Sequence, residues 1–86
     1  MYNYKTQKQN IFTEEGQVMF LKIRDKAYKL LEEAGAFSMG SVTSDLGLGG
    51  ETWNMHACVD RLVELNEIRE VTKEGVPGQH RIFVKL

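Results

Sequence analysis

Apolar residues recur along much of the chain at the three- and four-residue steps that are typical of amphipathic helices. The longest run predicts a helix over residues 13–34, with Thr13 as its N-cap and Gly35 as the glycine that ends it. Gly16 lies in the first turns of this helix and should weaken them slightly. The positions that we assign to its core face are Val18, Phe20, Ile23, Ala27, Leu30, Leu31 and Ala34.

A shorter helical pattern follows. It begins at Ser38, which can cap it, and ends at Gly47, with Val42 facing the core. Between the two helices, residues 36–37 are predicted to form a bridge or a short stub of strand.

A Gly-Gly turn leads into a third helix, which we predict over residues 51–66. Its inward stripe consists of Met55, Cys58, Val59, Leu62 and Leu65. At about 100° per residue, the positions that point outward are then Trp53, Ala57, Asp60 and Glu64, flanked by Asn54, His56 and Arg61. Asn66 can end this helix, because Asn tolerates the left-handed backbone conformation best after Gly.

Two strands complete the pattern, predicted over residues 68–72 and 80–86. Pro77 and Gly78 suit the two central positions of a type II turn, and the connection is long enough to form an exposed wing. We therefore predict an α+β, mostly helical fold: a winged helix-turn-helix with a three-helix core and a C-terminal two-stranded β-wing. This domain would span residues 13–86 and follow an N-terminal arm of residues 1–12.

Residues 42–71, VTSDLGLGGETWNMHACVDRLVELNEIREV, resemble the helix-turn-helix and first wing strand of small bacterial winged-helix regulators of the MarR-like and ArsR-like kind. Leu46-Gly47-Leu48 resembles their leucine-glycine-leucine turn, and residues 59–68 resemble the end of their recognition helix. The resemblance covers residues 13–86. It implies a sequence-specific DNA-binding protein in bacterial transcription regulation, with helix 51–66 in the major groove and the wing, residues 72–81, on the DNA backbone.

On this hypothesis, double-stranded DNA is contacted by the start of helix 51–66 and by the wing. Asn54 is placed for base edges, since Asn can pair with adenine through two hydrogen bonds. Arg81 is placed for phosphate. The predicted DNA-binding residues are Thr52, Trp53, Asn54, His56, Arg61, Lys73, Gln79, His80 and Arg81.

A net charge of −1 leaves a second hypothesis open, because nucleic-acid-binding domains often carry a basic excess. The chain would then be a winged-helix protein–protein interaction module that uses Trp53 and its neighbours. Trp53 itself has three alternative roles: it packs into the core, it contacts DNA, or it anchors a protein interface. Each predicted contact surface also has an interpretation without a ligand. The outer face of helix 51–66 would then be only solvated, and the wing charges would only protect an exposed sheet edge from pairing with another strand.

Catalysis has little support, and we expect neither an enzyme nor a cofactor. Cys58 lies on the apolar stripe and is predicted to be a small buried hydrophobe. His56 and Cys58 are two residues apart on a helix, so they do not form a metal-binding pair. Residues 47–50 are glycine-rich, but they suit a turn between helices better than a phosphate-binding loop.

Chain length and cysteine content set the remaining expectations. Eighty-six residues suit one domain, and one cysteine cannot form an internal disulfide, so we expect a cytoplasmic protein. No apolar run is long enough for a membrane span. We also predict a symmetric homodimer through residues 1–34, since a small core does not easily absorb the apolar surface of Tyr2, Tyr4, Ile11 and Phe12.

Overall fold

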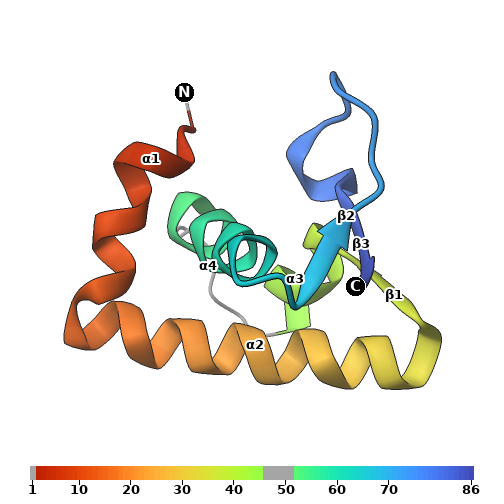
Figure 1. Cartoon of the computed structure of the whole chain (residues 1–86), viewed down its shortest axis with the longest axis horizontal. Coiled ribbons are helices and arrows are strands. Elements are labelled where there is room, and N and C mark those ends of the chain that lie inside the picture. Colours follow the sequence, from red (N-terminus) through yellow and green to blue (C-terminus); the bar gives the residue numbers. More distant parts are fainter. Residues whose placement is uncertain (1, 46–51) are drawn as a thin grey trace.

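The computed structural model describes residues 2–45 and 52–86 (Figure 1). In chain order its elements are α1 (Tyr4–Gln7), the 3₁₀ helix η1 (Lys8–Phe12), α2 (Glu14–Ala34), β1 (Ala36–Ser38), α3 (Met39–Asp45), α4 (Thr52–Glu64), β2 (Ile68–Glu70), the 3₁₀ helix η2 (Gly78–His80) and β3 (Ile82–Lys85). The long helix α2 runs along one side of the molecule. Helix α4 lies over it, between α1 on one flank and the β2–β3 ribbon on the other.

The sheet corrects one part of the predicted fold. The class is α+β and mostly helical, as expected, but the sheet of the described residues has three antiparallel strands in the order β1-β3-β2, not two. The predicted stub of strand after α2 forms β1, and Phe37 lies opposite Phe83 of β3 with the two rings 5.3 Å apart. Stacking of these rings joins the ribbon to the segment between α2 and α3.

Several predicted helix ends are confirmed. The Thr13 side chain accepts a hydrogen bond from the Gly16 backbone N–H, and Gly35 ends α2 in the left-handed conformation. Asn66 also has a positive φ of 61°, just after the last turn of α4. Ser38 accepts from the Ser41 N–H at the start of α3. The predicted end of that helix at Gly47 falls outside the described residues.

The core lies mainly between α2 and α4. Ile23 and Ala27 of α2 are fully buried, together with the predicted inward residues Met55, Cys58, Val59 and Leu62 of α4.

Three predicted core residues are exposed instead: Val18, Ala34 and Leu65. Val18 precedes Ile23 by five residues, which places it about 140° around the helix from the core side. Ala34 lies in the last turn of α2. Leu65 follows the last residue of α4, so helical spacing no longer sets its direction.

The wing also differs from the predicted geometry. Gly78 does not occupy the left-handed position of a type II turn; it begins η2, with Pro77 as the preceding cap residue. The positive φ in this connection is at Gly75. As a result the strands are shorter than predicted, and His80 lies in η2 instead of in β3. Gln79 and His80 remain exposed on this connection.

The N-terminal arm, defined here as residues 2–12, is folded onto the helices. It forms α1 and η1, and Ile11 is buried in the core with 2% of its surface exposed. Gly16 permits this arrangement, because a Cβ there would lie 1.9 Å from the Asn10 carbonyl oxygen. Packing of the arm therefore requires a glycine at position 16, a role that the helical pattern alone did not indicate.

Candidate functional site

The outer face of α4 is the surface formed by Trp53, Ala57, Asp60 and Glu64, which recur at helical spacing and were predicted to point outward. The two ends of this face are exposed at Trp53 and Glu64, and its middle is covered. Trp53 is 47% exposed, whereas Ala57 is fully buried. The expected exposure of Ala57 was therefore wrong. The helix is turned as predicted, but the arm and the wing close over its middle.

Polar side chains of the arm contact this face along its length. The Tyr2 hydroxyl donates to Asp60 Oδ2 at 2.5 Å, and the Tyr4 hydroxyl donates to Glu64 Oε1 at 2.9 Å. Lys8 Nζ lies 2.8 Å from Glu64 Oε2. Burial and then the hydrogen bond to a carboxylate raise the pKa of both tyrosines. The carboxylates of α4 are thus the acceptors that hold the arm.

The amide of Asn54 is also engaged by the arm. Asn10 Nδ2 donates to Asn54 Oδ1 at 3.3 Å, and the Asn54 side chain is only partly exposed. The structure therefore places the predicted adenine-reading residue beside the arm. Thr52 is the first residue of α4, and its side chain lies outside the described part of the chain.

His56 was predicted to flank an exposed DNA-reading surface, and its burial corrects this. It is 8% exposed, with the Tyr2 ring 5.3 Å away on one side. On the other side Gly78 of η2 comes so close that a Cβ there would lie 3.0 Å from His56 Cε1. Burial, followed by the neighbouring charge of Arg81, lowers the pKa of His56. A neutral His56 leaves Nδ1 free to accept a hydrogen bond.

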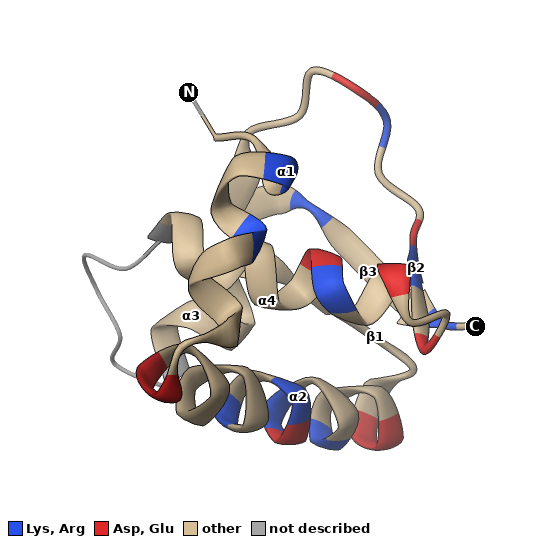
Figure 2. Cartoon of the chain, turned by 60° about the vertical axis from the view of Figure 1, so that its left-hand side comes forward, with Lys and Arg blue, Asp and Glu red and all other residues tan. Residues whose placement is uncertain are grey.

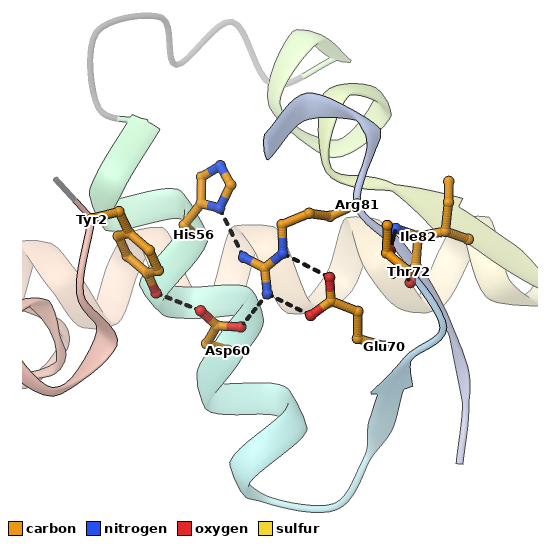
Figure 3. A network of polar contacts seen from close by, with 7 residues as sticks. All are labelled: Tyr2, His56, Asp60, Glu70, Thr72, Arg81 and Ile82. Carbon is orange, nitrogen blue, oxygen red and sulfur yellow. Dashed lines mark hydrogen bonds and ion pairs between the residues drawn. The ribbon is translucent and has the colours of Figure 1, made fainter. Parts of the chain in front are cut away.

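Arg81 is the centre of a polar cluster that also contains Tyr2, His56, Asp60 and Glu70 (Figure 3). Its Nε and Nη2 donate to the two Glu70 oxygens, each at 2.9 Å, in a bidentate pair. Nη2 also donates to Asp60 Oδ1 at 2.7 Å, and Nη1 lies 2.9 Å from His56 Nδ1. The cluster therefore ties the arm, α4 and the ribbon together.

This arrangement bears on the predicted phosphate contact of Arg81. The Arg81 side chain is only 17% exposed, and its guanidinium is already shared by two carboxylates. Burial alone would lower its pKa, but the hydrogen bonds to Glu70 and Asp60 raise it. The hydrogen bond from Arg81 in turn lowers the pKa of Glu70. In this conformation Arg81 stabilises the fold and is not free for phosphate.

Arg61, another predicted DNA contact, is neutralised in the same way. Its Nη1 lies 2.6 Å from Glu64 Oε1, and its guanidinium lies 5.3 Å from the Phe12 ring. Hydrogen bonds from Lys8, Arg61 and Tyr4 lower the pKa of Glu64 to about 2. Basic and acidic positions lie next to one another along α4 and the ribbon (Figure 2), as these ion pairs require.

The remaining predicted contacts lie on the wing. Lys73, Gln79 and His80 are exposed, and the segment that carries them projects from the molecule beside the ribbon. The structure therefore divides the predicted DNA-binding residues. Trp53 and the three wing residues are accessible, whereas His56, Arg61 and Arg81 are engaged within the protein.

The arm residues and acidic residues of this site were not among the predicted contacts. Tyr2, Tyr4 and Lys8 belong to the predicted arm, and Asp60 and Glu64 to the far end of the predicted outward helix face. One signal could have linked them: residues 1–12 contain two lysines and no acidic residue, whereas the outer helix positions carry carboxylates.

The surface predicted to pair two subunits is largely used within one chain. Ile11 is buried, and Tyr2 and Tyr4 contact α4, whereas Phe12 remains 56% exposed. A homodimer through residues 1–34 stays a prediction, but all four side chains proposed for it have contacts inside the protein, since the Arg61 guanidinium lies over the Phe12 ring.

Within residues 2–45 and 52–86, no group of three or more His, Cys, Asp or Glu side chains could hold a metal ion. Cys58 is buried as predicted, and burial raises the pKa of its thiol to about 12. None of the helices in this part of the chain is long and apolar enough to cross a membrane.

The fold and site thus define an α+β protein with a small antiparallel sheet and an α4 helix whose outer face is held by the arm. Comparison with models of protein families, with curated proteins and with solved structures finds no match to this chain. The functional argument therefore rests on the chemistry of the site.

Proposed function

We propose that the protein is a winged-helix interaction module that binds another protein through the outer face of α4, with Trp53 at one exposed end. The order α2, α3, α4, β2, β3 agrees with the helix, turn, helix and ribbon that the sequence resemblance implies. Pairing of β1 with β3 fastens the ribbon to the helical core. Fold order alone does not choose a ligand, so the choice depends on the surface.

The pairing of the cations on this surface is the observation that carries the proposal. Arg81 is bound by Asp60 and Glu70, while Lys8 and Arg61 share Glu64. Phosphate contacts supply much of the affinity of DNA-binding proteins, and here phosphate would have to compete with carboxylates and approach their negative charge. A protein partner has no such requirement.

The exposure of Trp53 also favours a protein partner. It is nearly half exposed at the start of α4, and Trp is enriched among the residues that dominate binding energy at protein interfaces. A large exposed aromatic side chain on the same helix as a partly buried polar cluster resembles an apolar anchor with a polar rim.

Photo-crosslinking from this position tests the proposal. Trp53→p-benzoylphenylalanine, in cells that make the protein, should give a discrete adduct with a protein. The same replacement of Tyr28, an exposed residue of α2, is the matched control and should not give this adduct. A nucleic-acid adduct from position 53, the same products from both positions, or no adduct would contradict the proposal.

Double-stranded DNA is the second candidate, and the exposed wing favours it. Lys73, Gln79 and His80 are accessible on the segment between β2 and β3, as a backbone-contacting wing requires. In this proposal the chain is a sequence-specific transcription regulator, with α4 in the major groove after the arm has moved aside. Residues 72–81 would follow the DNA backbone.

Selection from random duplex DNA, followed by titrations at several salt concentrations, tests the second candidate. Lys73→Gln should weaken selected and random DNA alike and reduce the salt slope by about one. Asn54→Ala should lower discrimination by roughly 1–3 kcal/mol at one base position. Lys29→Gln, at an exposed position of α2, is the control that should change neither. Failure to enrich any sequence would remove this candidate.

A further inference from the structure

We propose that the outer face of α4 is a binding site for a basic peptide segment bearing two tyrosines, and that the arm is its tethered occupant. The inference rests on the proposed protein-binding function and names the chemistry of the partner. A segment of another protein with the same side chains would displace residues 2–10 and take their place on this face.

Chemical complementarity between the arm and the face is the first argument. The arm has Lys5 and Lys8 but no acidic residue, while the face presents Asp60 and Glu64. The carboxylates of Asp60 and Glu64 lie one helical turn apart, and each accepts a tyrosine hydroxyl. Glu64 adds an ion pair with an amine. The site therefore selects aromatic hydroxyls together with a cation.

Side chains around the two carboxylates determine the shape of the site. Ala57 is fully buried in the middle of the face, where its small side chain lets a covering segment come close to the helix. The first tyrosine of the occupant places its ring against His56, with 5.3 Å between the ring centres. Arg81 fixes both His56 and Asp60 from the ribbon side. These contacts hold the recognition groups in place.

The arm is attached unevenly, which makes a partial release feasible. Among residues 2–12, all of which the structure describes, Ile11 is the only buried side chain. Close packing of Gly16 against Asn10 and Ile11 holds that end of the arm on α2. Helix α1 is four residues long, too short to be stable by itself. Residues 2–10 can therefore leave while Ile11 remains in the core.

A peptide titration on the full chain tests this proposal. The protein variant is Tyr2→Ala/Tyr4→Ala/Lys8→Ala, which removes the three arm contacts to the carboxylates. The probe is a synthetic peptide with the sequence of residues 2–10, followed by amide NMR shifts of α4. Saturable shifts of residues 56–64 are expected for the variant. Two control peptides, one with both tyrosines replaced by Phe and one with both lysines replaced by Glu, should each bind more weakly.

The wild-type protein provides the matched comparison. A tethered segment competes at an effective concentration in the millimolar range. The wild type should therefore bind the free peptide at least about tenfold more weakly than the variant. Equal binding by both proteins, or no shift in the variant at several millimolar peptide, would overturn the proposal. If the triple variant does not fold, Tyr2→Phe/Tyr4→Phe, which keeps both rings, gives the same comparison.

The outcomes also separate this inference from the proposed function. Peptide binding without a protein adduct from position 53 would keep the site and remove its role in binding another protein. A protein adduct without peptide binding would keep the interaction module and remove the basic, tyrosine-bearing partner. In the second case the arm is a fixed part of the fold.

Discussion

The two sides of α4 are held by different kinds of contact. Toward α2, the helix buries Met55, Cys58, Val59 and Leu62 completely, and burial of apolar surface contributes most of the free energy that favours folding. Toward the arm, carboxylates of the same helix accept hydrogen bonds from tyrosines and a lysine. The inner contact buries these four side chains, whereas the outer contact leaves Glu64 and most arm residues exposed.

This difference indicates which side of the helix can exchange partners. Apolar burial is lost only when the domain opens, and such an opening requires most of the global unfolding free energy. Exposed ion pairs are typically worth about 0–1 kcal/mol each. The outer side of α4 can therefore be uncovered without unfolding the inner side, and the following changes test this separation.

The largest expected effect is on the inner side. Leu62→Ala should lower the free energy of unfolding by roughly 2–5 kcal/mol, because it leaves a cavity at a fully buried position against α2. Chemical denaturation measures this. Leu65→Ala is the control, since Leu65 is exposed just beyond α4 and should cost little. Similar losses for both leucines would mean that the inner side is not where α4 is held.

Arg81 joins α4 to the ribbon, and its replacement should have the next largest effect. Arg81→Met should cost about 1.5–3 kcal/mol, the range for hydrogen bonds to charged groups, because Asp60 and Glu70 lose their shared donor. The control is Arg69→Met, at an exposed position of β2.

The pH dependence of stability identifies the Arg81 contribution. The folded pKa of Glu70 lies below its ordinary 4.5, so its stabilisation is present above that pH and is lost as the pH falls. Wild type should therefore lose stability below pH 4.5 more steeply than Arg81→Met. Parallel pH profiles for the two proteins would contradict the role of this pair.

Gly16→Ala separates helix propensity from packing. Alanine favours a helix over glycine, but its Cβ would meet the Asn10 carbonyl oxygen, which is backbone and cannot rotate away. We expect a net loss of roughly 1–3 kcal/mol and faster amide exchange in the arm. Gly35→Ala is the control. A Cβ there would meet no neighbouring atom and would only strain the left-handed backbone, so amide exchange in the arm should not change. A stabilised Gly16→Ala protein would show that the arm is not packed there.

A smaller effect is expected from Tyr2→Phe, which removes one hydroxyl from the outer side. The loss should be about 0.5–1.5 kcal/mol, with faster exchange confined to the arm and α4. Tyr28→Phe removes a similar hydroxyl, bonded to Glu67, far from the arm, and serves as the control. Equal arm exchange in both variants would show that the Tyr2 hydroxyl does not hold the arm.

Acid should release the arm before it unfolds the inner side. The pKa of Glu64 is lowered to about 2 from an ordinary 4.5, so its contacts stabilise the folded arm above pH 4.5. Protection of the arm should decline as the pH falls from 4.5 toward 2. Glu64→Gln should remove this part of the pH dependence. Simultaneous loss of arm and core protection would break the distinction between the two sides.

The inner side could be predicted from the sequence because it follows one rule. Apolar residues at helical spacing gave the correct inward direction for Met55, Val59 and Leu62, and Thr13, Gly35 and Asn66 gave correct helix ends. These signals are local, since each depends on residues within one or two turns.

The outer side depends on residues that are distant in the sequence. Tyr2 and Asp60 are separated by most of the chain, and neither shows in its own segment that it will meet the other. The same applies to Arg81. In the sequence alone, Arg81 can be read equally well as a phosphate contact or as a buried ion-pair partner. Only the fold, which places Asp60 and Glu70 around it, distinguishes the two roles. Pairing of β1 with β3 was missed for this reason too.

The order of strands in the sheet has a consequence for synthesis of the protein. β3 is the middle strand, and it is made after both of its neighbours. Until residues 82–85 have left the ribosome, β1 and β2 present strand edges without their partner, and such edges favour aggregation. A chain that ends before residue 82 would therefore contain all four described α-helices but would present β1 and β2 without the strand that joins them.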